Sequence, residues 1–217
     1  MKRLLREDID ALDKRFRAAL INSLSGFKSA NLIGTCDIKG QPNLSVVSSV
    51  VHLGSNPPLF GMVMRPPVVP RHTYENILAT GSYTINHINL DIAEQAHQTS
   101  ARYDREESEF DAVGLTPLWR EGSRAPAVKE AKVRMGLQLI RDIDIKENQT
   151  RFLVGELKWV EFPENAIAED GYLNIEDAGT VAISGLDGYH QTDHLGRLSY
   201  AKTDKEIVRL QEVMQGF

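Results

Sequence analysis

The apolar positions near the two ends of the chain recur at helical spacing. Near the start, large apolar residues follow one another by three or four positions, at Leu5, Ile9, Leu12, Phe16, Leu20 and Leu24. This stripe predicts a helix over about residues 5–25. Near the end, Thr203 and Glu206 have the spacing of a capping box, which predicts a second helix over about residues 204–215. Both apolar faces are expected to pack on a core or on a second subunit.

Between the two ends the pattern changes to that of strands. Segments rich in β-branched residues and bounded by turn residues predict strands at residues 31–37, 44–53, 59–64, 83–88, 133–145 and 152–162. The first two and the last two are expected to form hairpins. A short helix is expected from Tyr74 to Ala79 with Thr73 as its N-cap, and another helix is expected after Asn89.

Short strands in antiparallel connections, with few helices between them, indicate a mainly β fold with flanking helices, of the α+β class. A small barrel that closes to remove its strand edges is the expected architecture. Strands that do not alternate with helices argue against a doubly wound parallel sheet. No internal linker divides the chain, so residues 1–217 are expected to form one domain, with residues 101–128 as a long irregular excursion.

The composition narrows the range of functions. Lys and Arg number 25 and Asp and Glu 30, so the net charge of −5 argues against nucleic-acid binding through phosphates. No stretch reaches the ~18 apolar residues that would cross a membrane, and the acidic start predicts no signal peptide. These features predict a cytoplasmic protein without a membrane partner. The single cysteine, Cys36, predicts no Cys-rich metal site, and His190 and His194 are expected to be ordinary loop histidines.

One candidate for anion binding is the proline-rich segment at residues 65–77. It carries Arg65 and Arg71 directly before a predicted helix start at Thr73. A helix N-terminus offers free N–H groups and partial positive charge, and an arginine beside it adds a fork suited to phosphate oxygens. The alternative is that Thr73 only caps the helix while both arginines are solvated surface charges.

A second candidate is the strand at residues 43–49. Alternation places Leu44, Val46 and Ser48 on one face and Asn43, Ser45 and Val47 on the other. Small hydroxyl side chains leave the backbone accessible to a flat polar heterocycle. The alternative is an ordinary strand whose small residues pack against a helix. The two candidates together describe a site for an aromatic phosphate ester.

At these residues the chain resembles the flavin reductase-like family of FMN-binding split-barrel flavoproteins. Further elements of the resemblance are the motifs at residues 56–58, 81–86, 108–117, 155–156, 185–189 and 197–200. The resemblance implies an antiparallel split β-barrel of the Greek-key type. It also implies a homodimer and noncovalent FMN near the subunit interface.

The resemblance also assigns site residues. It places the flavin ring and ribityl chain against Asn43, Ser45, Val46, Val47 and Ser48. It places the phosphate near Arg65, Arg71, His72, Thr73 and Asn76, with His72 standing where the family commonly has an aspartate. Thr99 and Ser100 are implied flavin neighbours, and Arg197 and Tyr200 are implied at the open face.

The function implied is that of an NAD(P)H-dependent oxidoreductase. Hydride would pass from the nicotinamide to the bound flavin and electrons would then pass to an acceptor, a small molecule or a protein. No protein side chain is needed as a catalytic acid or base in that step. The alternatives are an FMN electron carrier or split-barrel oxidase that uses no nicotinamide, and a non-enzymatic flavin- or haem-binding barrel.

Overall fold

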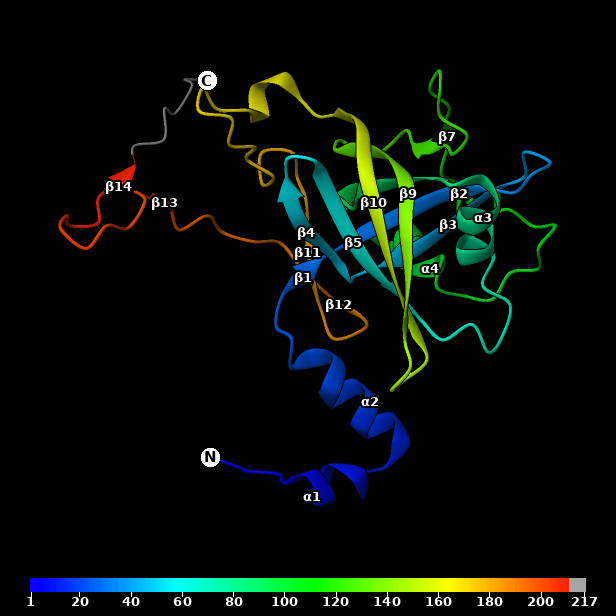
Figure 1. Cartoon of the computed structure of the whole chain (residues 1–217), viewed down its shortest axis with the longest axis horizontal. Helices are drawn as coiled ribbons and strands as arrows, with labels where there is room; N and C mark the ends of the chain where they lie inside the picture. Colours follow the sequence, from blue (N-terminus) through cyan, green and yellow to red (C-terminus); the bar gives the residue numbers. More distant parts are fainter. Residues whose placement is uncertain (211–217) are drawn as a thin grey trace.

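The computed structural model describes residues 1–210 and is built around one seven-stranded sheet (Figure 1). The strand order is β3-β2-β6-β9-β10-β5-β4. The bounds are β2 Asn31–Cys36, β3 Pro42–Val47, β4 Val50–Ser55, β5 Pro58–Met64, β6 Ser82–His87, β9 Arg134–Ile145 and β10 Thr150–Glu161. Every neighbouring pair is antiparallel, which confirms the predicted mainly β class and both hairpins.

The sheet is not closed by hydrogen bonds. Its end strands, β3 and β4, are consecutive in the chain, and within residues 1–210 no ladder joins them. The strand predicted over residues 44–53 breaks at Ser48 and Ser49, and the Ser49 hydroxyl donates to Val63 O at 2.8 Å. The barrel is therefore split between β3 and β4, and the expectation that it closes to remove all edges is wrong at this point.

Short helices flank the sheet. They are α3 His72–Thr80, η1 Leu90–Ile92, α4 Ala93–Gln98, α5 Glu109–Val113 and η2 Glu164–Ala166. Helix α3 ends at Gly81, whose positive φ of 69° is the left-handed conformation that glycine favours at a helix end. Asn89 caps η1 as expected, because its side chain accepts a hydrogen bond from Asp91 N.

Short strands complete the structure. Strands β1 Lys28–Ser29, β11 Ala182–Ser184 and β12 Gly188–His190 form a three-stranded sheet. Two-stranded pairs are formed by β7 Pro117–Leu118 with β8 Ala127–Val128, and by β13 Arg197–Leu198 with β14 Arg209–Leu210. The first of these pairs lies inside the segment that was expected to be irregular.

Two apolar cores lie on opposite faces of β2, all six of whose residues are buried. Leu32 belongs to the first core, together with Leu44 of β3 and Phe110 of α5. Ile33 belongs to the second core, together with Ile77 of α3. Successive strand residues point to opposite faces, so β2 and β3 are held from both sides and α3 and α5 are fixed near the open edge of β3.

The predicted helix over residues 5–25 is two helices, α1 Arg6–Asp10 and α2 Lys14–Ser23. Asp13 separates them because its side chain caps α2, accepting from Arg15 N at 2.9 Å and Phe16 N at 3.1 Å. Neither helix buries a residue, and Figure 1 shows both extending away from the sheet. The apolar stripe does not pack on this chain's own core.

The helix predicted over residues 204–215 does not form where the structure describes the chain. Residues 203–208 are turn and irregular backbone apart from an isolated bridge between Lys202 and Lys205, and β14 follows at Arg209–Leu210. The capping spacing of Thr203 and Glu206 is a local signal, and these exposed residues have no core to pack on, so packing does not support a helix here. The remaining residues of the prediction, 211–215, lie outside the described residues.

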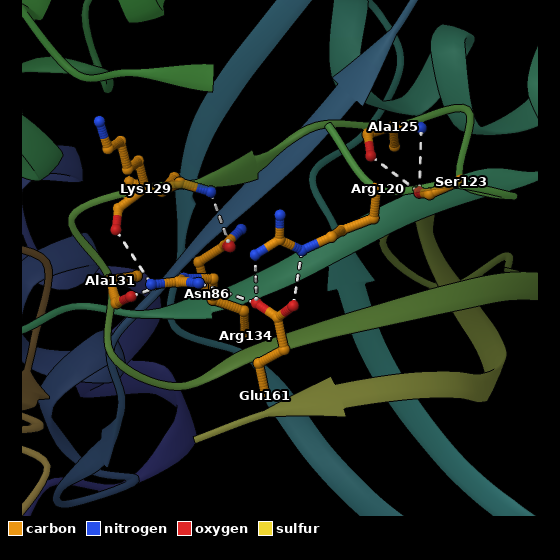
Figure 2. Close-up of polar contacts among 9 residues, drawn as sticks. Asn86, Arg120, Ser123, Ala125, Lys129, Ala131, Arg134 and Glu161 are labelled. Carbon is orange, nitrogen blue, oxygen red and sulfur yellow. Dashed lines mark hydrogen bonds and ion pairs between the residues drawn. The ribbon is translucent and has the colours of Figure 1, made fainter. Parts of the chain in front are cut away.

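The loop over residues 119–131, which includes β8, is fastened to β6, β9 and β10 by polar contacts (Figure 2). Glu161 accepts from Arg120 Nε at 2.6 Å and from Arg134 Nη1 at 2.8 Å. Pro126 O accepts from the Thr84 hydroxyl at 2.7 Å. A Cβ on Gly34 would lie 2.1 Å from Pro126 O, so only glycine allows the loop to approach β2 this closely.

Candidate functional site

Three arginines gather near the start of α3. Arg71 precedes the helix, its Nε donates to Pro66 O at 3.5 Å, and its side chain is partly buried. Burial lowers the pKa of Arg71, and the nearby positive charges of Arg65 and Arg102 lower this pKa further. Within residues 1–210 none of the three forms an ion pair with a carboxylate. Like charges held together without acids favour the binding of an anion.

Helix α3 begins one residue before the predicted N-cap. Arg71 occupies the N-cap position, and its backbone N–H donates to Glu75 Oε1 at 3.0 Å. Glu75 is also paired with Arg105, which offsets its negative charge beside the helix start. The next N–H groups, of His72 and Thr73, lie in the first turn, where no intrahelical acceptor exists. Thr73 as the helix cap is therefore wrong, whereas the helix start beside Arg71 is confirmed.

The outer edge of β3 is the open edge of the sheet. Leu44 N donates to Glu109 Oε2 at 2.9 Å and so points away from β2. In an antiparallel pair, backbone groups alternate between facing the partner strand and facing outward, so the N–H and C=O of Val46 also face outward. The side chains of Leu44 and Val46 pack on the first core and Val47 packs on the second, as the alternation predicted.

Asn43 is the centre of a buried hydrogen-bond network. Its Nδ2 contacts Glu109 Oε1 at 2.8 Å and Oε2 at 2.7 Å. Its Oδ1 accepts from the Thr35 hydroxyl at 3.1 Å and the Thr73 hydroxyl at 2.8 Å. The Asn43 side chain is thereby fully engaged by protein groups. These hydrogen bonds link β3 to α3 and to α5.

Thr73 joins this network to Ser45, since their hydroxyl oxygens lie 2.9 Å apart. Asn76 is buried, and its Nδ2 donates to the Thr35 hydroxyl at 3.2 Å. A hollow of about 10 Å³ beside Asn43 is lined by His72 and Asn76 among others. It has room for about one water, so a larger ligand would lie across the open edge of β3 rather than inside this hollow.

The remaining predicted site residues are Ser48, Arg65, Thr99 and Ser100, and they lie outside the Asn43 network. Ser48 is half-buried in the turn between β3 and β4, and Arg65 is exposed after β5. Thr99 is buried at the end of α4, where its hydroxyl donates to Ala96 O at 2.7 Å, and Ser100 after it is exposed. Helix α4 contacts β3, which brings this segment towards the same edge.

Two residues that the resemblance placed at the open face of the flavin, Arg197 and Tyr200, lie in and just after β13. Arg197 is in β13, donates to Asp170 through both terminal nitrogens and lies 4.2 Å from the Tyr172 ring centroid. Tyr200 is 89% exposed. The structure does not bring either of them to the α3 and β3 site within this chain. His190 lies in β12 rather than in the expected loop, because β12 pairs with β11, and its ring contacts the Ser184 hydroxyl at 2.7 Å.

Two residues of the site were missed from the sequence. Arg102 lies beyond α4 and was not distinguished from other surface charges, although it is only two residues after the implied Ser100. Glu109 was noted only as part of a motif. Its burial, at 7% exposed, was the missing signal, because no local pattern indicates that a carboxylate meets the edge of β3 some sixty-five residues earlier.

Comparisons with known proteins identify the family and the fold. A family model described as "Flavin reductase like domain" matches residues 24–181. The chain belongs to this flavin reductase-like family. A 106-residue stretch is 26% identical to an uncharacterised protein of Aquifex aeolicus, covering 49% of this chain and 53% of that protein, so the match spans about half the length of that relative.

Solved structures share the architecture. A candidate flavin reductase with a split barrel domain from Shewanella frigidimarina is 54% identical, with a TM-score of 0.89, over 93% of this chain and 100% of that chain. Component B of nitrilotriacetate monooxygenase from Bacillus cereus is 20% identical (TM-score 0.80; 91% and 100% covered). An FMN-binding protein from Thermus thermophilus is 17% identical (TM-score 0.63; 76% and 86% covered). The last two show the fold alone, and together the three confirm the predicted split-barrel fold.

Proposed function

We propose that this protein is an FMN-dependent oxidoreductase that takes hydride from NAD(P)H. The observation that carries the proposal is the group formed by Arg65, Arg71 and Arg102, three positive charges around the start of α3 that form no ion pair with a carboxylate among the described residues. This arrangement suits a phosphate dianion, because the arginines and the first N–H groups of the helix can all donate to it. The FMN-binding protein of Thermus thermophilus, which has the same fold, adds support for this choice of cofactor.

The flavin ring has a matching surface. The outward N–H and C=O of Val46 can form hydrogen bonds with a flat heterocycle, and Ser45 lies between this edge and α3. Ser48, Thr99 and Ser100 would border the ring or the ribityl chain. Bound flavin would supply the hydride chemistry, while the protein holds the phosphate, positions the ring along β3 and leaves one ring face accessible.

The use of a nicotinamide is the finer part of the proposal. A Streptomyces globisporus protein of similar fold is an NADH:FAD oxidoreductase, which makes NADH or NADPH a reasonable electron donor here. The experiment is an absorbance spectrum of the purified protein before and after anaerobic addition of each nicotinamide. An oxidised flavin spectrum that is bleached by NADH or NADPH is expected. A flavin-containing protein inert to both would instead indicate an electron carrier or an oxidase.

The choice of flavin is tested by thermal unfolding. FMN, FAD and riboflavin are each added to the apoprotein, and FMN is expected to raise the midpoint most. A ligand that binds only the native state, at a free concentration ten times its Kd, stabilises that state by about 1.4 kcal/mol. Failure of every flavin to shift the midpoint would contradict the proposed function.

We also propose that the protein is a homodimer. Phe16 and Leu24 of α2 are 58% and 69% exposed, and β4 adds the exposed Val51 and Leu53. An apolar stripe that does not pack on its own chain fits a second copy of that chain. Sedimentation analysis is expected to give the mass of a dimer, and Phe16→Asp is expected to shift it towards the monomer. A monomeric wild-type protein would contradict this assignment.

A further inference from the structure

In the hydrogen-bond network around Asn43, each group has a defined role as donor or acceptor, and Glu109 sets these roles at one end. Burial raises the pKa of Glu109, and the hydrogen bonds from Leu44 N and Asn43 oppose this rise. In its ionised form Glu109 only accepts hydrogen bonds, and both of its oxygens lie within 2.8 Å of Asn43 Nδ2. The amide of Asn43 therefore turns its NH₂ group towards Glu109 and its oxygen towards the two threonines. The contact of Leu44 N with Glu109 Oε2, at 2.9 Å, holds the carboxylate in place.

The direction continues through Thr73 to Ser45. Asn43 Oδ1 cannot donate, so the single hydroxyl hydrogen of Thr73 is used in the 2.8 Å contact with that oxygen. The remaining contact, 2.9 Å between the oxygens of Thr73 and Ser45, is then made by the hydroxyl hydrogen of Ser45. Ser45 thus has its hydrogen turned inward and presents only lone pairs outward.

A second branch of the network agrees with this direction. Thr35 donates its hydroxyl hydrogen to Asn43 Oδ1 at 3.1 Å, and its oxygen accepts from Asn76 Nδ2 at 3.2 Å. Each hydroxyl hydrogen in the two branches has one acceptor, so no hydroxyl can reverse without breaking a bond. Buried networks of this kind are rigid when every member is satisfied.

We propose that Glu109 is a positioning residue for the flavin site, because it makes Ser45 a hydrogen-bond acceptor towards the ligand. The ligand group that contacts Ser45 is then a donor, such as a ribityl hydroxyl or a ring N–H, and not a phosphate or carbonyl oxygen. This inference rests on the proposed flavin site. It also assigns different chemistry to the two ends of that site, with acceptors at Ser45 and cationic donors at Arg71.

The test is a double-mutant cycle on FMN affinity, with Glu109→Gln and Ser45→Ala. The new amide can donate to Asn43 Oδ1, which turns the Asn43 amide over and leaves Ser45 presenting its hydrogen to the ligand. Glu109→Gln is expected to weaken FMN by roughly five- to twentyfold when Ser45 is present, and by less than twofold in the Ser45→Ala background. Asp111→Asn, an exposed acid on the same helix, is the matched control and is expected to change nothing.

The outcomes separate a positioning role from a structural one. A loss of affinity that persists equally in the Ser45→Ala background, or no loss at all, would overturn the proposal. Should Glu109→Gln not fold, Thr73→Val releases the same Ser45 hydrogen while keeping the side-chain shape, and unchanged FMN affinity in that variant would equally overturn it. Wild-type protein that binds no FMN would count against the proposed function itself, so the two failures are distinguishable.

Discussion

This protein has two groups of neighbouring arginines, and only one of them is paired with a carboxylate. Arg120 and Arg134 share the carboxylate of Glu161 and fasten the loop over residues 119–131, as Figure 2 shows. Arg65, Arg71 and Arg102 gather near the start of α3, and in the described part of the chain no acid pairs with them. The first group is neutralised by the fold itself. The second remains positive, and an anion brought from outside would relieve its repulsion.

The difference is informative because the net charge of the chain is negative. With five more acidic than basic residues, the chain does not lack carboxylates to place beside Arg71. Glu75, the nearest acid in α3, is engaged with Arg105 and with the Arg71 backbone. Arginines that form no ion pair in the described part of an acidic chain therefore fit the proposed anion site, whereas the paired group fits a structural role. The following predictions test this distinction.

The largest expected effect is that of Arg71→Ala on FMN binding. Removing a charge-assisted contact worth about 1.5 to 3 kcal/mol should weaken FMN by roughly tenfold to a hundredfold. Riboflavin, which lacks the phosphate, should bind both forms equally. Calorimetric titration measures this, with Arg141→Ala, an exposed arginine of β9, as the control. Equal FMN affinity in the Arg71 variant would remove Arg71 from the site.

The opposite pattern is expected for Glu161→Gln. Loss of the shared carboxylate leaves Arg134, which is 19% exposed, without its ion pair and loosens the loop. The free energy of unfolding should fall by about 1 kcal/mol, as measured by urea denaturation, because the pairs are partly solvated. FMN affinity should not change. An FMN defect as large as that of Arg71→Ala would show that the two groups are not functionally distinct.

A smaller effect is expected for Arg102→Ala. Its charge lies near Arg71, and Coulomb interaction with a phosphate in partly solvated surroundings contributes under about 1 kcal/mol. FMN should bind about two- to fivefold more weakly, and riboflavin should again be unaffected. The loss should shrink in high salt, since screening weakens exposed charges. A loss of riboflavin binding would show that Arg102 acts on the ring or the fold instead.

The smallest expected effect is the acid dependence of the loop contacts. The hydrogen bond from Arg120 holds the pKa of Glu161 below its usual range, with a further contribution from Arg134. A lowered carboxyl pKa stabilises the folded state above the unfolded-state pKa, near 4.3, and this stabilisation is lost as the pH falls through the folded-state pKa. The stability difference between wild type and Glu161→Gln should therefore be present at pH 7 and disappear in acid. A difference that is unchanged at pH 3 would contradict the assignment to Glu161.

The strands were the most predictable part of this molecule. Period-two patterns and turn residues indicated β2, β3, β5, β6, β9 and β10 because a strand buried on one or both faces must carry those residues. The helix start beside Arg71 was predictable for a similar reason, since proline stiffens the preceding loop and an apolar face follows. The strand patterns and this helix start are local properties, because they depend on residues that are neighbours along the chain.

The terminal helices show the limit of such patterns. The stripe from Leu5 to Leu24 was real, but Asp13 capped a second helix within it and broke the first. The spacing at Thr203 predicted a helix where the described chain forms a turn and β14. A helical pattern fixes a structure only when the apolar face is buried, whereas α1 and α2 bury no residue and residues 203–210 are exposed.

What the sequence by itself determined is the set of strands, the helix that begins at the arginine loop and the resemblance that connects the two. Only the tertiary structure decided which polar groups form hydrogen bonds or ion pairs within the protein and which remain available to a ligand. It turned Asn43 onto Glu109 and Thr73 onto Asn43, and it brought Arg102 towards Arg71 from another segment. The physical reason is that hydrogen bonds and charges act between neighbours in space, and no short-range pattern in a chain records which distant residues its folding brings together.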